Sequence, residues 1–82
     1  MDSAVFFKQI SINNQVISFK LTPVSTADGP AVFVRVLDEL KRVVFIMNSI
    51  KGNWKIKRQD NFPIWLLEFE YALSQAINDR GI

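Results

Sequence analysis

Two apolar runs that flank an asparagine pair constrain the fold more than any other feature of the chain. In AVFFKQISINNQVISFKLTPV, residues 4–24, apolar and polar positions largely alternate, which is typical of β-strands. Asn13 and Asn14 tolerate the positive φ angles of a two-residue hairpin turn. This turn predicts strands over about 4–12 and 16–24, with the facing pairs Ile10 and Ile17, Lys8 and Phe19, and Phe6 and Leu21. A three-residue loop would mix the apolar and polar sides, so the two-residue turn is preferred.

The stretch AVFVRVLDELKRVVFIMN, residues 31–48, follows a connection over 25–30 that is rich in turn residues and allows two interpretations. A helix would begin near Asp28 and bury a stripe of Phe33, Leu37, Leu40, Val44 and Met47. A hairpin is favoured, because six of the eighteen residues are valine or isoleucine, which suit a pleated sheet. We therefore expect strands over about 31–38 and 42–48 with a turn centred on Glu39 and Leu40. One face then carries Val32, Val34, Val36, Val43, Phe45 and Met47, and the other carries Phe33, Arg35, Leu37, Arg42, Val44 and Ile46.

The last third of the chain predicts one short strand and one helix. After a loop over 48–53, the strand over about 53–58 places Trp54, Ile56 and Arg58 on one side and Lys55 and Lys57 on the other, as an edge strand protected by lysines. The helix over about 62–80 has Asp60 or Asn61 as its cap, Pro63 in its first turn and Gly81 at its end. Its buried stripe is Phe62, Leu66, Phe69, Leu73, Ala76 and Ile77.

These elements predict an α+β fold, in which a four- to five-stranded antiparallel β-meander precedes one C-terminal α-helix packed on one face. With 82 residues, of which 49% are hydrophobic and 22% charged, the chain has the length and composition of a single globular domain over 1–82. It has no cysteine, so its stability comes from packing or from association with another chain.

One helix covers only one face of a sheet, and the other face of this sheet is also apolar. Burial of a large apolar side chain is worth about 1.5–3 kcal/mol, and contiguous exposed patches usually mark interaction sites. We therefore expect a homodimer or a protein partner on the uncovered face. The expected interface residues are Phe33, Leu37, Val44 and Ile46, with Arg35 and Arg42 positioning the contact.

The residue inventory argues against an enzyme. The chain has no histidine and no cysteine, so the commonest general base, the usual activated nucleophiles and nitrogen or sulfur metal ligands are absent. Of the carboxylate pairs, Asp38 and Glu39 fall in a predicted turn, and Glu68 and Glu70 project about 200° apart on a helix. The three glycines are too scattered for a phosphate-binding loop. We expect no catalytic residue, no metal and no cofactor.

A basic segment supplies a second functional hypothesis. Residues 41–58 hold six of the ten positive charges and no acid, whereas residues 60–79 hold four acids and no base. Basic strands with a nearby aromatic ring bind single-stranded nucleic acid. The candidate residues are Lys51, Trp54, Lys55, Lys57 and Arg58. Strand alternation places Trp54 opposite Lys55 and Lys57, which favours a core or interface role for the tryptophan and a solvated edge for the lysines.

The N-terminal stretch MDSAVFFKQ lacks the basic region and the longer apolar run of a signal peptide. No apolar run approaches the eighteen or so residues of a membrane span. These features lead us to expect a soluble, cytoplasmic protein. The net charge of +2 is too small to indicate a partner by itself.

The stretch GNWKIKRQDNFPIWLLEFEYALSQAI, about a third of the chain, resembles the end of small uncharacterised bacterial proteins. In those proteins a strand with Gly-x-Trp precedes a proline-initiated helix that ends in Ala-Ile, and the family has no assigned activity. The order of sheet and helix also resembles the dimeric PC4-like and Whirly single-stranded-DNA binders. That resemblance is one of topology, without a shared motif, and so it implies no particular binding residue.

Overall fold

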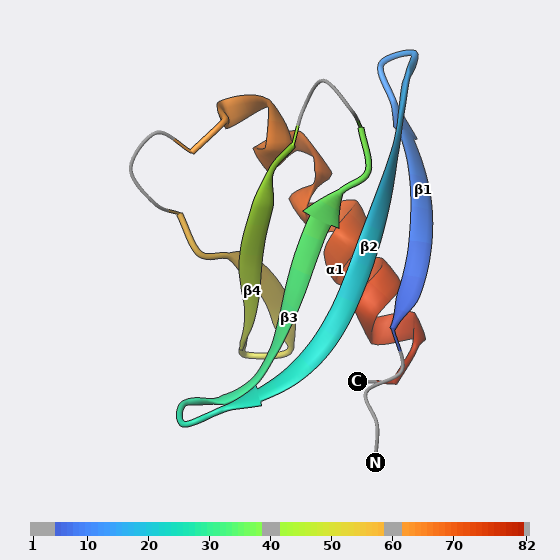
Figure 1. The fold of residues 1–82 in the computed structure, drawn as a ribbon. Helices are drawn as coiled ribbons and strands as arrows, with labels where there is room; N and C mark the ends of the chain where they lie inside the picture. Colours follow the sequence, from blue (N-terminus) through green and yellow to red (C-terminus); the bar gives the residue numbers. More distant parts are fainter. Residues whose placement is uncertain (1–4, 39–41, 59–61, 82) are drawn as a thin grey trace.

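A five-stranded antiparallel meander and one C-terminal helix form an α+β fold in the computed structural model, which describes residues 5–38, 42–58 and 62–81 (Figure 1). The strand order in the sheet is the chain order, from β1 to β5. The strands are β1 (Phe6–Ile12), β2 (Gln15–Thr26), β3 (Gly29–Val36), β4 (Val44–Ile50) and β5 (Asn53–Ile56). A 3-10 segment, η1 (Ile64–Phe69), leads directly into the α-helix α1 (Glu70–Asp79).

The first hairpin has the predicted register. Asn13 and Asn14 have φ angles of 52° and 64°, as a two-residue hairpin turn requires. Ile10 therefore pairs with Ile17, and both side chains are buried. The prediction is confirmed because the turn residues and the apolar alternation specify the same register.

The β2–β3 connection is tighter than the sequence suggests. Strand β2 runs to Thr26 and β3 begins at Gly29, so the turn consists of two residues. The sequence predicted a connection of six residues, 25–30. The Thr26 hydroxyl accepts a hydrogen bond from the backbone N–H of Asp28 (3.2 Å) and donates one to the carbonyl of Gly29 (2.8 Å). Asp28 is thus a turn residue rather than a helix cap.

The hairpin interpretation of residues 31–48 is correct, and the helical alternative is wrong. Val34 pairs with Phe45 and Val32 with Met47, which places the two predicted faces as expected. Strand β4 begins at Val44 rather than at residue 42. The predicted turn at Glu39 and Leu40 lies outside the described residues.

The predicted loop over 48–53 is wrong. Strand β4 continues to Ile50, which pairs with Asn53, and the turn consists of Lys51 and Gly52 alone. Both turn residues have positive φ angles, 53° and 85°. A lysine in that conformation is uncommon, so the sequence gives a weak signal for this turn. Strand β5 ends at Ile56, two residues before the predicted end.

The C-terminal helix begins later than predicted. Residues 64–69 form 3-10 turns, and regular α-helix starts at Glu70. A 3-10 turn aligns residues three apart, so Leu66 and Phe69 point together into the core. Pro63 precedes this segment and no side chain caps it. The predicted caps Asp60 and Asn61 lie outside the described residues. Gly81 ends the helix as predicted, with φ at 78° and its N–H donating to the Asn78 carbonyl (3.0 Å).

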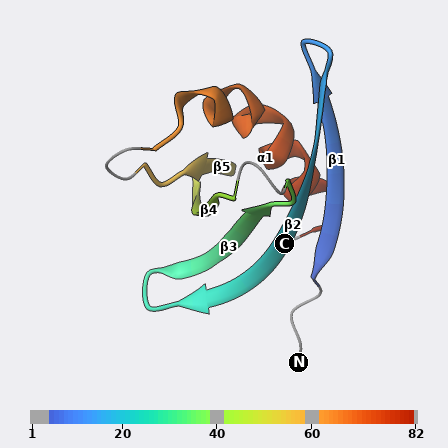
Figure 2. The same ribbon diagram turned by 45° about the horizontal axis from the view of Figure 1, so that its top comes forward.

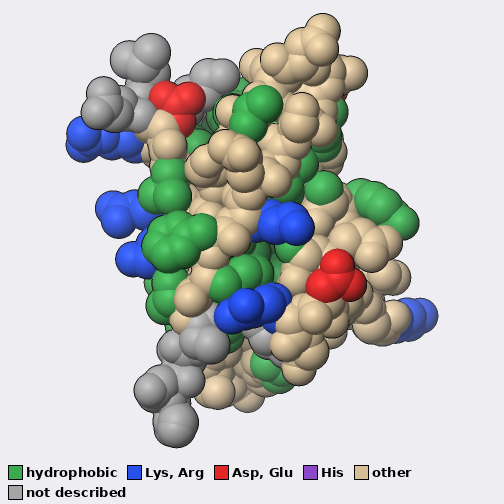
Figure 3. Space-filling model, turned by 90° about the vertical axis from the view of Figure 1, so that its right-hand side faces the viewer, with side chains coloured by type: hydrophobic (Ala, Val, Ile, Leu, Met, Phe, Trp, Pro, Cys, Tyr) green, Lys and Arg blue, Asp and Glu red, His purple; other side chains and the backbone are tan. Residues whose placement is uncertain are grey.

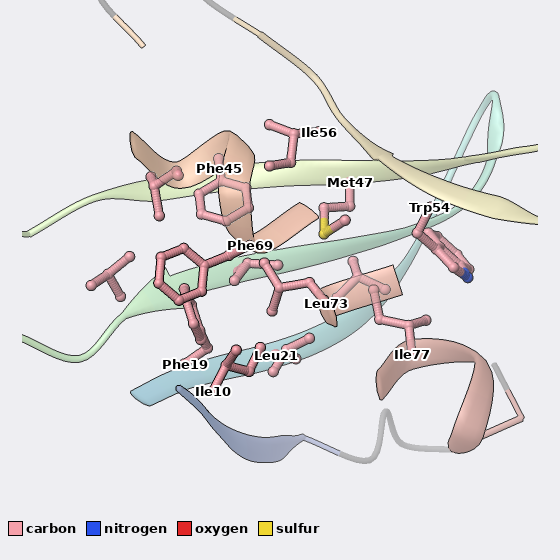
Figure 4. Packing of buried hydrophobic residues seen from close by; sticks show 14 of the residues in the cluster. Ile10, Phe19, Leu21, Phe45, Met47, Trp54, Ile56, Phe69, Leu73 and Ile77 are labelled. Carbon is pink, nitrogen blue, oxygen red and sulfur yellow. The ribbon is translucent and has the colours of Figure 1, made fainter. Parts of the chain in front are cut away.

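The sheet curls around the helix, and the core fills the space between them (Figures 1, 2 and 4). The inner face of the sheet supplies Phe19, Leu21 and Met47, and the helix supplies Leu66, Phe69, Leu73 and Ile77, all fully buried. At the C-terminal end of α1, the Arg80 guanidinium lies 4.6 Å from the centre of the Phe6 ring in β1.

Strand β5 is an edge strand, as predicted, and α1 lies against that edge. The backbone N–H of Trp54 donates to the Ser74 hydroxyl (2.9 Å), and the N–H of Ile56 donates to a carboxylate oxygen of Glu70 (2.8 Å). These donors point away from β4, so helix side chains satisfy groups that would otherwise invite another strand. Because α1 takes this edge and the inner side of the curl, no described helix or strand covers the opposite face of the sheet.

Candidate functional site

The outer face is the side of the sheet opposite α1, and it carries large exposed apolar side chains. Phe33, Leu37 and Val44 are 44%, 44% and 54% exposed, and they lie on β3, just after it, and on β4. Phe7 on β1 and Val16 on β2 extend the same face and are also exposed. Figure 3 views the molecule from the β1 side, and this face is seen in profile along the left margin, where hydrophobic side chains gather with lysine and arginine, and with an acidic side chain at the upper end.

The structure brings all six predicted interface residues to this face. Phe33 lies opposite Ile46, and Arg35 lies opposite Val44. Leu37 and Arg42 extend the same two strands beyond the ladder, and the Leu37 N–H donates to the Ser18 carbonyl (2.9 Å). Ile46 is half-buried and the other five residues are exposed. The apolar centre therefore spans β3 and β4.

Positive side chains surround this apolar centre. Lys20 on β2 lies directly opposite Arg35 on β3, and like charges in that position destabilise a strand pair. Lys55 and Lys57 approach from the β5 side, where the Lys57 N–H donates to the Ile46 carbonyl (2.8 Å). The described strands contain no acidic residue. Asp38, just beyond β3, lines a hollow with Leu37, Arg42 and Val44 at the end of the face. Lys20 was missed as a site residue because its place depends on the β2–β3 register.

An open hollow lies in the middle of the outer face. Its volume is about 270 Å³, and it lies between the Lys20–Arg35 pair and the apolar residues Phe33 and Val44. The hollow combines apolar walls with two unlike cation types, an ammonium and a guanidinium. Such a site suits an apolar side chain with a negative group beside it.

The residues of the nucleic-acid hypothesis are divided between two environments. Lys51 is in the β4–β5 turn, and Lys55, Lys57 and Arg58 are exposed. Trp54 is only 3% exposed and packs in the core. Its indole N–H donates to the Asn78 side-chain carbonyl (3.2 Å). The Trp54 ring is therefore not available to stack on a base. Phe33, and Phe7 opposite Lys20, are exposed aromatic rings near the cations of the outer face.

The carboxylates of the described residues lie apart from one another. They contain no cluster of three or more carboxylate, histidine or cysteine groups that could hold a metal ion. One Glu70 carboxylate oxygen accepts the hydrogen bond from Ile56, which gives this residue a structural role. No helix in the described ranges has the length and apolar character to cross a membrane.

Comparisons of the chain with protein-family models, with curated proteins and with solved structures returned no match in any of the three.

Proposed function

We propose that this chain is a non-enzymatic association domain that binds protein through the outer face of its sheet. The bound protein is either a second copy of this chain, which is tested first, or a different protein chain. The observation that carries it is the exposed apolar centre of Phe33, Leu37 and Val44 on a sheet whose own helix covers the opposite face.

The position of the helix supports this assignment. The helix is held against β5 by the Ser74 and Glu70 hydrogen bonds and reaches β1 through Arg80. It therefore has no freedom to cross to the outer face without losing these contacts. The apolar centre with its polar rim also has the anatomy of a protein interface, in which apolar anchors are surrounded by charged residues.

Replacing Val44 and Ile46 with aspartate together is expected to abolish self-association and leave a folded monomer of 9.4 kDa. Two carboxylates placed in an apolar interface lose hydration without gaining partners, so we expect at least about a hundredfold weaker association, or about 3 kcal/mol. Sedimentation velocity over a concentration series measures the mass, and circular dichroism checks the fold. The matched control, Ser25→Asp with Ala27→Asp, adds the same charge at the exposed β2–β3 hairpin tip. Unchanged association of the Val44 and Ile46 variant would overturn the proposal.

Single-stranded nucleic acid is the second candidate, and one observation favours it. Lys20, Arg35, Lys55 and Lys57 lie on one face, near the exposed rings of Phe7 and Phe33. Phosphate contacts to these cations and stacking on the rings are the two usual contributions to such binding.

This candidate predicts that a labelled single-stranded oligonucleotide binds at 50 mM salt and binds about fifty-fold more weakly at 200 mM. The estimate assumes about four phosphate contacts and a slope of roughly −0.7 per contact for single strands. Fluorescence anisotropy measures both affinities, and Lys55→Gln with Lys57→Gln is expected to flatten the salt dependence. An absence of binding at 50 mM salt would eliminate this candidate.

A further inference from the structure

The exposed side of the C-terminal helix carries a large aromatic side chain, Tyr71. We define the helix stripe as Glu68, Tyr71 and Gln75. Tyr71 is 74% exposed, more than any other large hydrophobic residue among those described. The Gln75 side-chain amide donates to the Tyr71 hydroxyl (2.7 Å), and both side chains are exposed. Tyrosine is among the residues that most often anchor protein interfaces.

The helix stripe and the outer face have opposite charge. Glu68 lies three residues before Tyr71 on the stripe, and further along the helix Asp79 is exposed. The outer face has the Lys20–Arg35 pair beside its hollow, and its described strands contain no acid. Asp38, beyond the end of β3, lies at the margin of the face in a hollow with Leu37 and Arg42. A symmetric pairing of two outer faces would bring mainly cations against cations. A pairing of outer face with helix stripe brings apolar residues together and sets a carboxylate against the cations.

We infer that self-association is head to tail, with the helix stripe of one copy seated on the outer face of the next. This inference rests on the proposed function, because it assigns the occupant of the same outer face. The Tyr71 ring enters the hollow between Phe33 and Val44, and Glu68 lies beside Lys20 and Arg35. The carboxylate also relieves the repulsion between those two neighbouring cations.

A head-to-tail contact is heterologous, so each bound pair still presents one free outer face and one free helix stripe. Such contacts continue into a ring or an open chain of copies rather than stopping at two. The wild-type chain is therefore expected to form species larger than a dimer as its concentration rises. Because the contact pairs a carboxylate with exposed cations, association is expected to weaken severalfold between 50 and 500 mM salt.

Mixing two complementary variants tests the inference. The face variant carries Val44→Asp and Ile46→Asp, and the helix variant carries Glu68→Lys and Tyr71→Lys at exposed positions where lysine is compatible with a helix. Each variant alone is expected to remain a monomer of 9.4 kDa with at least about a hundredfold weaker association. An equimolar mixture is expected to form a species of two chains, because the intact stripe of one variant fits the intact face of the other. Sedimentation velocity gives the masses, and circular dichroism verifies that both variants fold.

The outcomes separate this inference from the proposal beneath it. If the helix variant alone associates as strongly as the wild type, the face binds another surface and the head-to-tail arrangement is wrong, although the outer face keeps its role. If the two folded variants remain monomers when mixed, the head-to-tail arrangement is also wrong. If the face variant associates like the wild type, the proposed function itself fails.

Discussion

Replacing Phe69 with alanine is expected to lower the free energy of unfolding by about 3–5 kcal/mol, the usual range for a buried phenylalanine. Phe69 is fully buried where η1 meets α1. Its ring centre lies 5.5 Å from that of Phe19 on the sheet and 6.0 Å from that of Trp65. The substitution leaves a cavity between helix and sheet, and a small domain has only about 5–15 kcal/mol of stability in total. Urea denaturation followed by circular dichroism measures the loss.

Phe33→Ala is the matched control, because it removes the same side chain from the outer face. Phe33 is 44% exposed and packs on one side only, so we expect a loss of about 1 kcal/mol or less. The difference between the two losses of unfolding free energy measures how much more Phe69 contributes to the core than Phe33 does. A loss for Phe33→Ala equal to that for Phe69→Ala would contradict the placement of the two rings.

Replacing Trp54 with alanine is expected to cost about 3–5 kcal/mol of stability and to leave the exposed cations of the outer face in place. The indole is buried between β5 and α1, and its N–H is hydrogen-bonded to Asn78. The substitution therefore opens a cavity and leaves the Asn78 acceptor without its indole donor. Thermal unfolding monitored by circular dichroism measures the effect.

Trp54→Phe separates the packing of the ring from its hydrogen bond. Phenylalanine retains most of the apolar volume and lacks the indole N–H, so about 1–2 kcal/mol is the expected loss. Any oligonucleotide affinity is expected to be unchanged in this variant. A large drop in oligonucleotide affinity with stability intact would contradict the buried position of Trp54.

The sheet was predictable where local turn chemistry and side-chain alternation agree. Asn13 and Asn14 tolerate positive φ, and only their two-residue turn keeps Ile10 and Ile17 on one side, so the first register follows from local sequence. The faces of the second hairpin follow in the same way from the valine and isoleucine alternation. The predicted apolar stripe of the helix lies in the core, with Phe62 half-buried at its start.

Features that depend on tertiary contacts were not predictable. The Lys51 and Gly52 turn places a lysine at positive φ, a conformation that sequence propensity disfavours. The roles of Ser74 and Glu70 depend on the helix lying beside β5, whereas both residues look like ordinary polar positions in the sequence. The cation pair of the candidate site, Lys20 with Arg35, depends on the register between β2 and β3. Trp54 is a further example. Its neighbours in the sequence are basic, but its ring lies in the core and not on the basic surface.

The central claim is that the outer face of the sheet is a binding surface for protein, and first of all for a second copy of this chain. Sedimentation velocity of the wild-type chain, from about 1 µM to about 1 mM at low salt, tests it most directly. We expect a weight-average mass that exceeds 9.4 kDa and rises with concentration. A constant mass of 9.4 kDa across that range would contradict self-association through the outer face.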